Sequence, residues 1–118
     1  MQSTNVAIVG LGKIGSFFLQ QLISRFNLGL NIICAVEPND TEGKELAQKN
    51  GIAVVTIDDL ISFEDDVHII FNLTGLDSVQ QEIRHKLDAS CNFKTELLSD
   101  NVLKVVWSML TDEPIPER

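Results

Sequence analysis

A glycine-rich turn between two apolar segments constrains the fold of this chain more than any other feature. The sequence VAIVGLGKIG contains the pattern G-x-G-x-x-G at Gly10, Gly12 and Gly15. The apolar run over 5–9 predicts a buried strand, and the apolar spacing over 13–26 predicts an amphipathic helix. In this position, between a strand and a helix, the pattern is typical of a loop that binds a dinucleotide.

Each glycine of the turn has its own physical role. Gly10 permits the tight turn out of the strand, Gly12 lets a pyrophosphate approach the backbone, and Gly15 lets the helix lie close to the sheet. The first-turn N–H groups, around Lys13 and Ile14, would face the anion at the positive end of the helix dipole. Lys13 would be favourable beside a pyrophosphate; the alternative is that it is a solvated surface residue.

An acid at the end of the next strand supplies the second half of this fingerprint. Glu37 ends the run NIICAVE, close to the expected spacing of about 20 residues after the glycines. Its carboxylate would accept hydrogen bonds from ribose hydroxyls and repel a 2′-phosphate, so the sequence favours NAD over NADP as the cofactor. The alternative is an ordinary acid at a strand end.

A third group of candidate residues follows a later apolar run, VHIIFNL. Asn72, Thr74 and Gly75 stand where this run ends, beside the point at which the strand order is expected to reverse. Ligands bind at such points in doubly wound sheets. We therefore expect these residues to contact the middle of the cofactor or its nicotinamide ribose; the alternative is a simple strand-to-helix turn.

Strand and helix patterns alternate along the whole chain. The five predicted strands are 5–9, 31–37, 52–57, 67–73 and 93–98. This alternation predicts an α/β, three-layer doubly wound Rossmann-type fold with a five-stranded parallel sheet in the order 3-2-1-4-5. We expect a single dinucleotide-binding domain over 1–110, followed by a tail or linker stub over 111–118.

Composition limits the function further. The chain has 118 residues, 17 Asp and Glu against 9 Lys and Arg, and a formal net charge of −8. The acidic balance argues against nucleic acid or an anionic membrane as a partner. No apolar run reaches the roughly 20 residues of a spanning helix. Cys34 and Cys91 make neither a disulfide framework nor a zinc spacing, so we expect a cytoplasmic protein without a metal site.

Candidate catalytic side chains are few. The chain has no tyrosine, His68 opens a predicted strand at the end away from the ligand, and His85 lies in the middle of a predicted helix. Cys34 reads as a small buried side chain, and a redox role for Cys91 remains open. We predict no catalytic residue. A chain of this length also leaves little room for a separate substrate domain.

The last predicted helix, over 101–110, carries apolar residues around about 200° of its circumference, twice what a surface helix needs. One face must pack on the sheet, and the excess predicts contact with a second subunit, as in a homodimer, or with a further domain. The alternative is that the tail covers it. The residues expected in this contact are Val102, Val106, Trp107 and Leu110.

The stretch 6–17, together with Glu37 and the turn 72–75, resembles the N-terminal NAD-binding domain of many dehydrogenases. The glucose-fructose oxidoreductase-like group and the homoserine or aspartate dehydrogenases are examples. The resemblance covers about residues 5–90. It implies a domain that binds the cofactor while a C-terminal domain supplies the chemistry. The Glu-Lys-Pro type motif of the first group is absent.

A narrower resemblance adds the residues 36–39 and the ending 101–110 with its tryptophan. These look like small Rossmann domains at the N-termini of bacterial PAS-containing sensor kinases, although 99–101 departs from the Gly-rich turn expected there. The glycine turn and Glu37 are also similar to those of potassium-channel regulatory domains. Both likenesses imply a nucleotide or ligand sensor.

Three hypotheses follow. The first is an NAD(P)-binding module that senses or regulates without catalysis of its own. The second is the cofactor-binding domain of an NAD-dependent oxidoreductase whose substrate domain is absent from this chain. The third is a domain of the same shape that has lost its ligand and only dimerises.

Overall fold

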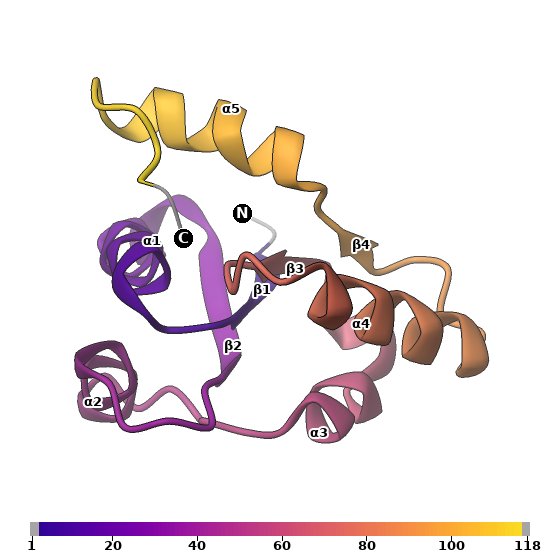
Figure 1. Ribbon diagram of the computed structural model, residues 1–118. Helices are drawn as coiled ribbons and strands as arrows, with labels where there is room; N and C mark the ends of the chain where they lie inside the picture. Colours follow the sequence, from indigo (N-terminus) through magenta and orange to yellow (C-terminus); the bar gives the residue numbers. More distant parts are fainter. Residues whose placement is uncertain (1–2, 117–118) are drawn as a thin grey trace.

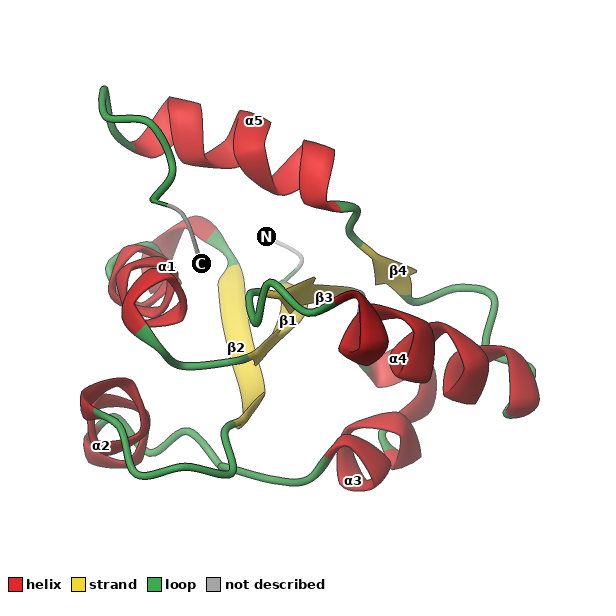
Figure 2. Ribbon diagram, in the orientation of Figure 1, coloured by secondary structure: helices red, strands yellow, loops and turns green. Residues whose placement is uncertain are grey.

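The computed structural model describes residues 3–116, whose helices surround a parallel sheet (Figures 1 and 2). The strands are β1 (Thr4–Val9), β2 (Leu30–Val36), β3 (Ile69–Asn72) and β4 (Glu96–Leu97). All paired strands are parallel, and their order across the sheet is β2-β1-β3-β4. The helices are α1 (Lys13–Ile23), α2 (Glu42–Lys49), α3 (Ile57–Ser62), α4 (Asp77–Ala89) and α5 (Asp100–Leu110), with 3-10 turns η1 (Phe26–Leu28) and η2 (Glu64–Asp66).

Side chains of the central strand alternate between two cores, which makes the fold three-layered. Val6 and Ile8 of β1 point into one apolar cluster, and Ala7 and Val9 point into the other. Both faces of the sheet are therefore buried, as expected for a parallel sheet. The first cluster is completed by α1, α2 and α5, and the second by α3 and α4, which lie on the opposite side of the sheet in Figure 1.

The prediction of a strand over 52–57, the third of the five in chain order, is wrong. This segment forms only one isolated bridge, between Ala35 of β2 and Val54. Thr56 then starts α3 with a reciprocal capping box, in which its hydroxyl accepts from the amide of Asp59 and the Asp59 carboxylate accepts from the amide of Thr56. Because this cap turns the chain into a helix directly after the bridge, the ladder cannot extend. The other four predicted strands keep their predicted order.

Several helices begin directly after a residue whose side chain caps the first turn. Thr41 caps α2, because its hydroxyl accepts from the amide of Lys44 at 3.1 Å. Ser99 caps α5 by accepting from the amide of Val102 at 3.3 Å. The helix α4 is an exception, because its N-cap is Leu76 and no side chain caps it.

The tryptophan of α5 is buried rather than exposed, which corrects the expectation that it faces a partner. Trp107 is only 7% exposed. Its indole nitrogen donates to the carbonyl of Glu113 at 2.7 Å, and its ring lies 4.7 Å from that of Phe17. The segment 111–116 thus folds back over the helix. Val106 and Leu110 pack partly against the core, whereas the exposed apolar residues of α5 are Val102, Val105 and Met109.

Two further properties of residues 3–116 bear on function. None of their helices combines the length and the apolar character needed to cross a membrane. The two cysteines occupy contrasting environments, because Cys34 is buried in β2 and Cys91 is exposed after α4. Burial raises the pKa of the Cys34 thiol to about 12.

We expect the two thiols to differ sharply in reactivity. At pH 8, with Ellman's reagent, Cys91 should react quickly, and Cys34 should react only after denaturant is added. The reason is that the thiolate is the nucleophile and burial disfavours it at Cys34. The Cys91→Ser variant is the control and should show no rapid reaction. Rapid modification of two thiols in the native protein would contradict this expectation.

Candidate functional site

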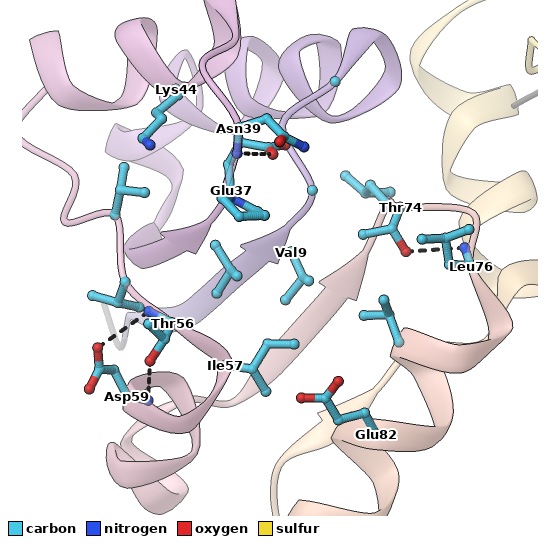
Figure 3. Close-up of a pocket in the computed structure, with 18 of the residues that line it drawn as sticks. Val9, Glu37, Asn39, Lys44, Thr56, Ile57, Asp59, Thr74, Leu76 and Glu82 are labelled. Atoms are coloured by element: carbon cyan, nitrogen blue, oxygen red, sulfur yellow. Dashed lines mark hydrogen bonds between the residues drawn. The ribbon is translucent and has the colours of Figure 1, made fainter.

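A large cavity opens where three neighbouring strands end (Figure 3). Its volume is about 950 Å³, near the upper limit for small-molecule sites. The carboxyl ends of the strands line this cavity. Val9 ends β1 and Gly10 follows it, Glu37 follows β2, and Thr74 lies just after β3. Ligands of doubly wound sheets bind at this edge. The structure therefore brings Gly10, Gly12, Glu37 and Thr74 to a single cavity.

The conformation of Gly10 fixes the start of the glycine turn. Its φ is +95°, a region that disfavours residues with a side chain. A Cβ at this position would also lie 2.9 Å from the methyl carbon of Thr74. The Gly10 amide donates to the carbonyl of Val36 at 2.8 Å. The turn is therefore packed between the ends of β2 and β3, and only glycine fits there.

The other two glycines differ in what surrounds them. A Cβ at Gly12 would meet no atom within 4 Å, so the backbone at this position is open. A Cβ at Gly15 would overlap the carbonyl oxygen of Gly10, so the first turn of α1 lies directly against the glycine turn. No side chain caps α1. An uncapped helix start beside open space is a fitting place for a phosphate group.

Glu37 has a structural task that the sequence pattern did not indicate. Its side chain is buried, and one carboxylate oxygen accepts from the amide of Leu11 at 2.8 Å. The other oxygen accepts from the amide of Asn39 at 3.0 Å (Figure 3). The acid thereby ties the glycine turn to the end of β2. Its predicted contact with ribose hydroxyls remains a prediction.

The third predicted group is split by the structure. Thr74 lines the large cavity, whereas Asn72 and Gly75 line a separate cavity of about 390 Å³. The Asn72 side-chain oxygen accepts from the Thr74 hydroxyl at 2.7 Å and from the Thr74 amide at 3.2 Å. Its side-chain nitrogen donates to Gln80 at 3.0 Å. Asn72 therefore braces the turn that carries Thr74.

Lys13 and Ile14 lie beside a neighbouring cavity rather than in the large one. That cavity, of about 630 Å³, lies between the first turns of α1 and α2 and the segment 111–116. Gly12 borders both cavities. A ligand over Gly12 would thus be close to Lys13 and to the end of the described chain.

Several lining residues were not found by the sequence analysis. They come from the loop after β2, from α2, from the loop and helix that replace the predicted third strand, and from α4 with its N-cap residue: Asn39, Lys44, Gln48, Val54, Val55, Thr56, Ile57, Asp58, Asp59, Leu76, Val79, Glu82 and Lys86. For Lys44 a signal was present, because a cation in the first turn of a helix opposes the helix dipole. In the structure the same turn also carries Glu42 and Glu45, and Asp40 lies 3.9 Å from the Lys44 ammonium.

The two lysines of the cavity differ in their partners. The Lys86 ammonium lies 2.6 Å from an oxygen of Asp58 and 3.0 Å from an oxygen of Glu82, and these hydrogen bonds raise the pKa of Lys86. Lys44 has one ion pair, at 3.9 Å, with the fully exposed Asp40. The positive charge of Lys44 is therefore the less compensated of the two.

The histidines lie elsewhere. His68 accepts, through Nδ1, a hydrogen bond from the amide of Asn5 at 2.8 Å, at the opposite end of the sheet from the cavity. His85 is exposed on α4, and neither histidine lines the large cavity. Within residues 3–116, no group of three His, Cys, Asp or Glu side chains is placed to bind a metal ion.

Comparisons with known proteins agree with this geometry. A family model described as an oxidoreductase family with an NAD-binding Rossmann fold matches residues 4–100. No curated protein matches the chain. The crystal structure of RSP, a Rex-family repressor, is similar with a TM-score of 0.56 at 15% identity. The crystal structure of RSP in complex with beta-NADH is similar with a TM-score of 0.57 at 16% identity.

These structural matches cover a larger share of this chain than of the RSP chains. Each alignment covers 92% of this chain, but only 59% and 60% of the two RSP chains. This chain therefore spans about three fifths of the length of those proteins. At such low identity the similarity shows a shared fold.

Proposed function

Because the chain belongs to the oxidoreductase family with an NAD-binding Rossmann fold, we propose that it is an NAD(H)-sensing or regulatory module without catalysis of its own. The observation that carries the proposal is the large cavity at the ends of β1, β2 and β3, where Gly12 is open and α1 begins without a cap. This arrangement suits the pyrophosphate of a dinucleotide.

The residues around this point suit the rest of the cofactor. The backbone at Gly12 and the first turn of α1 would hold the pyrophosphate. The adenine ribose would lie toward Glu37 and the nicotinamide half toward Thr74, since these residues border the cavity on either side of Gly10. When bound, NAD would supply a nicotinamide that accepts a hydride. We further propose that the negative charge of Glu37 favours NAD over NADP.

Two observations support a sensing role. The similar solved chain is named as a repressor and has been crystallised with beta-NADH. In this chain, Gly12 also borders the cavity whose wall is formed by Trp107 and the segment 111–116. A nucleotide over Gly12 would therefore lie next to the returning segment 111–116. That position suits transmission of the binding state to an attached domain or a partner.

The alternative is the cofactor-binding domain of an NAD-dependent oxidoreductase. The description of the matching family favours it. This role requires substrate-binding residues from outside the chain, and this chain spans only about three fifths of the length of the solved RSP chains.

Calorimetric titration with NAD and NADH tests the proposal. We expect one site per chain and an affinity difference between NADH and NAD of about tenfold, because a sensor must bind its two ligands unequally to shift an equilibrium. Equal affinities together with hydride transfer to or from an added substrate would support the oxidoreductase alternative. The absence of binding by either nucleotide would contradict both.

A further inference from the structure

We propose that Lys44 is a specificity-determining residue at the ribose end of the cavity, where it offsets Glu37 and allows a dinucleotide with a 2′-phosphate to bind. This inference rests on the proposed dinucleotide site. An acid at the end of the second strand would by itself predict strong exclusion of NADP. The structure places a cation on the same wall of the cavity, and the balance between the two charges sets the preference.

The position of Lys44 carries the first part of the argument. Lys44 lies in the first turn of α2 and lines the cavity together with Glu37 and Asn39 (Figure 3). Its side chain is 23% exposed. A partly buried ammonium interacts more strongly with a nearby anion than a fully solvated one, because less water screens the charge.

The partners of Lys44 and Lys86 carry the second part. Lys86 is hydrogen-bonded to two carboxylates, so its charge is already compensated within the cavity wall. The carboxylate paired with Lys44 belongs to Asp40, which is fully exposed and 3.9 Å away. Exposed pairs of this kind contribute little free energy and exchange easily. A phosphate in the cavity can therefore replace Asp40 as the partner of Lys44.

The hydrogen bonds of Glu37 carry the third part. Both carboxylate oxygens accept from backbone amides, those of Leu11 and Asn39. Charge-assisted bonds of this type are strong and hold the carboxylate in place. Because Glu37 is buried, little water screens its repulsion of a 2′-phosphate, so binding of NADP depends on a cation such as Lys44 that offsets this charge. The electrostatic field at the ribose thus depends on both Glu37 and Lys44.

The sequence position of Lys44 is consistent with a role in binding an anion. The Lys44 amide is capped by Thr41, so its charged side chain lies near the positive end of the α2 dipole. This placement costs the helix a small amount of free energy in the absence of ligand. An anion bound there gains from both the lysine and the helix start, against the repulsion of Glu42 and Glu45 in the same turn. A 2′-phosphate carries close to two negative charges.

The test compares NAD and NADP binding to the wild-type chain, Lys44→Ala and Lys49→Ala by calorimetry. Lys49 lies in the last turn of the same helix, is exposed, and does not line the cavity, so its removal matches the change in net charge. We expect NADP to bind the wild type within about tenfold of NAD. Lys44→Ala should weaken NADP about tenfold and leave NAD within about twofold, and Lys49→Ala should change neither.

Other results would overturn the inference in distinguishable ways. Equal weakening of NAD and NADP by Lys44→Ala would mean that Lys44 acts on the shared pyrophosphate. Unchanged NADP affinity in that variant, or NADP binding to the wild type more than about a hundredfold weaker than NAD, would show that Lys44 provides no 2′-phosphate contact. In these cases NAD binding survives, and so does the proposed function. Loss of NAD binding in the wild type would contradict the proposed function itself, and the inference with it.

Discussion

Replacement of Gly12 by valine is expected to weaken NAD binding at least about a hundredfold while the melting temperature stays within a few degrees of the wild type. In the free protein a side chain at this position meets no atom within 4 Å, and the backbone φ of −75° suits any residue. The valine would instead fill the space that the pyrophosphate needs. Losing two charge-assisted hydrogen bonds at about 1.5–3 kcal/mol each accounts for an effect of this size.

Calorimetry for affinity and circular dichroism for melting measure the two quantities separately. The variant Gly12→Ala gives a graded control, since one methyl group should cost part of the affinity and none of the stability. Wild-type affinity in Gly12→Val would show that the pyrophosphate lies elsewhere. A large drop in melting temperature would show that Gly12 is needed by the fold rather than by the ligand.

The second large effect is expected at Gly15, and it concerns stability. A Cβ at this position would overlap the Gly10 carbonyl oxygen, which is part of the backbone and cannot rotate away. Gly15→Ala should therefore lower the free energy of unfolding by about 3 kcal/mol. For a domain of this size the melting temperature would fall by roughly 10 °C. The sign of this change in stability is informative, because replacing glycine by alanine inside a helix otherwise stabilises a protein by about 1 kcal/mol.

Gly12→Ala is again the matched control, because it adds the same methyl group three residues earlier, where space is available. Chemical denaturation of both variants gives the two free energies directly. If Gly15→Ala were as stable as Gly12→Ala, the close packing of α1 against the glycine turn would be absent in solution.

The sequence predicted the features of this protein that depend on local chemistry. The three glycines, the strand before them and the helix after them were found together, because the turn needs both a positive φ and a close approach of two backbones. Glu37 was correctly placed at the end of β2, where it lines the cavity.

Features that depend on packing between distant segments could not be found in the same way. The run 52–57 has strand-like residues, but the capping box of Thr56 and Asp59 turns it into a helix start after one bridge. Trp107 looked exposed because helical periodicity says nothing about the segment that later covers it. Lys44 lines the cavity only because α2 packs next to the glycine turn. Asn72 does not line it, because its side chain is hydrogen-bonded to Thr74.

The covered indole also has an optical consequence. The chain contains one tryptophan and no tyrosine, so its intrinsic emission arises from a single ring, which lies against Phe17 and is hydrogen-bonded to Glu113. Fluorescence therefore reports on the core between α1, α5 and the returning segment, where the ring also lies 5.9 Å from that of Phe18. A melt followed by emission would report on this region alone, whereas circular dichroism would report on the helices of the whole fold.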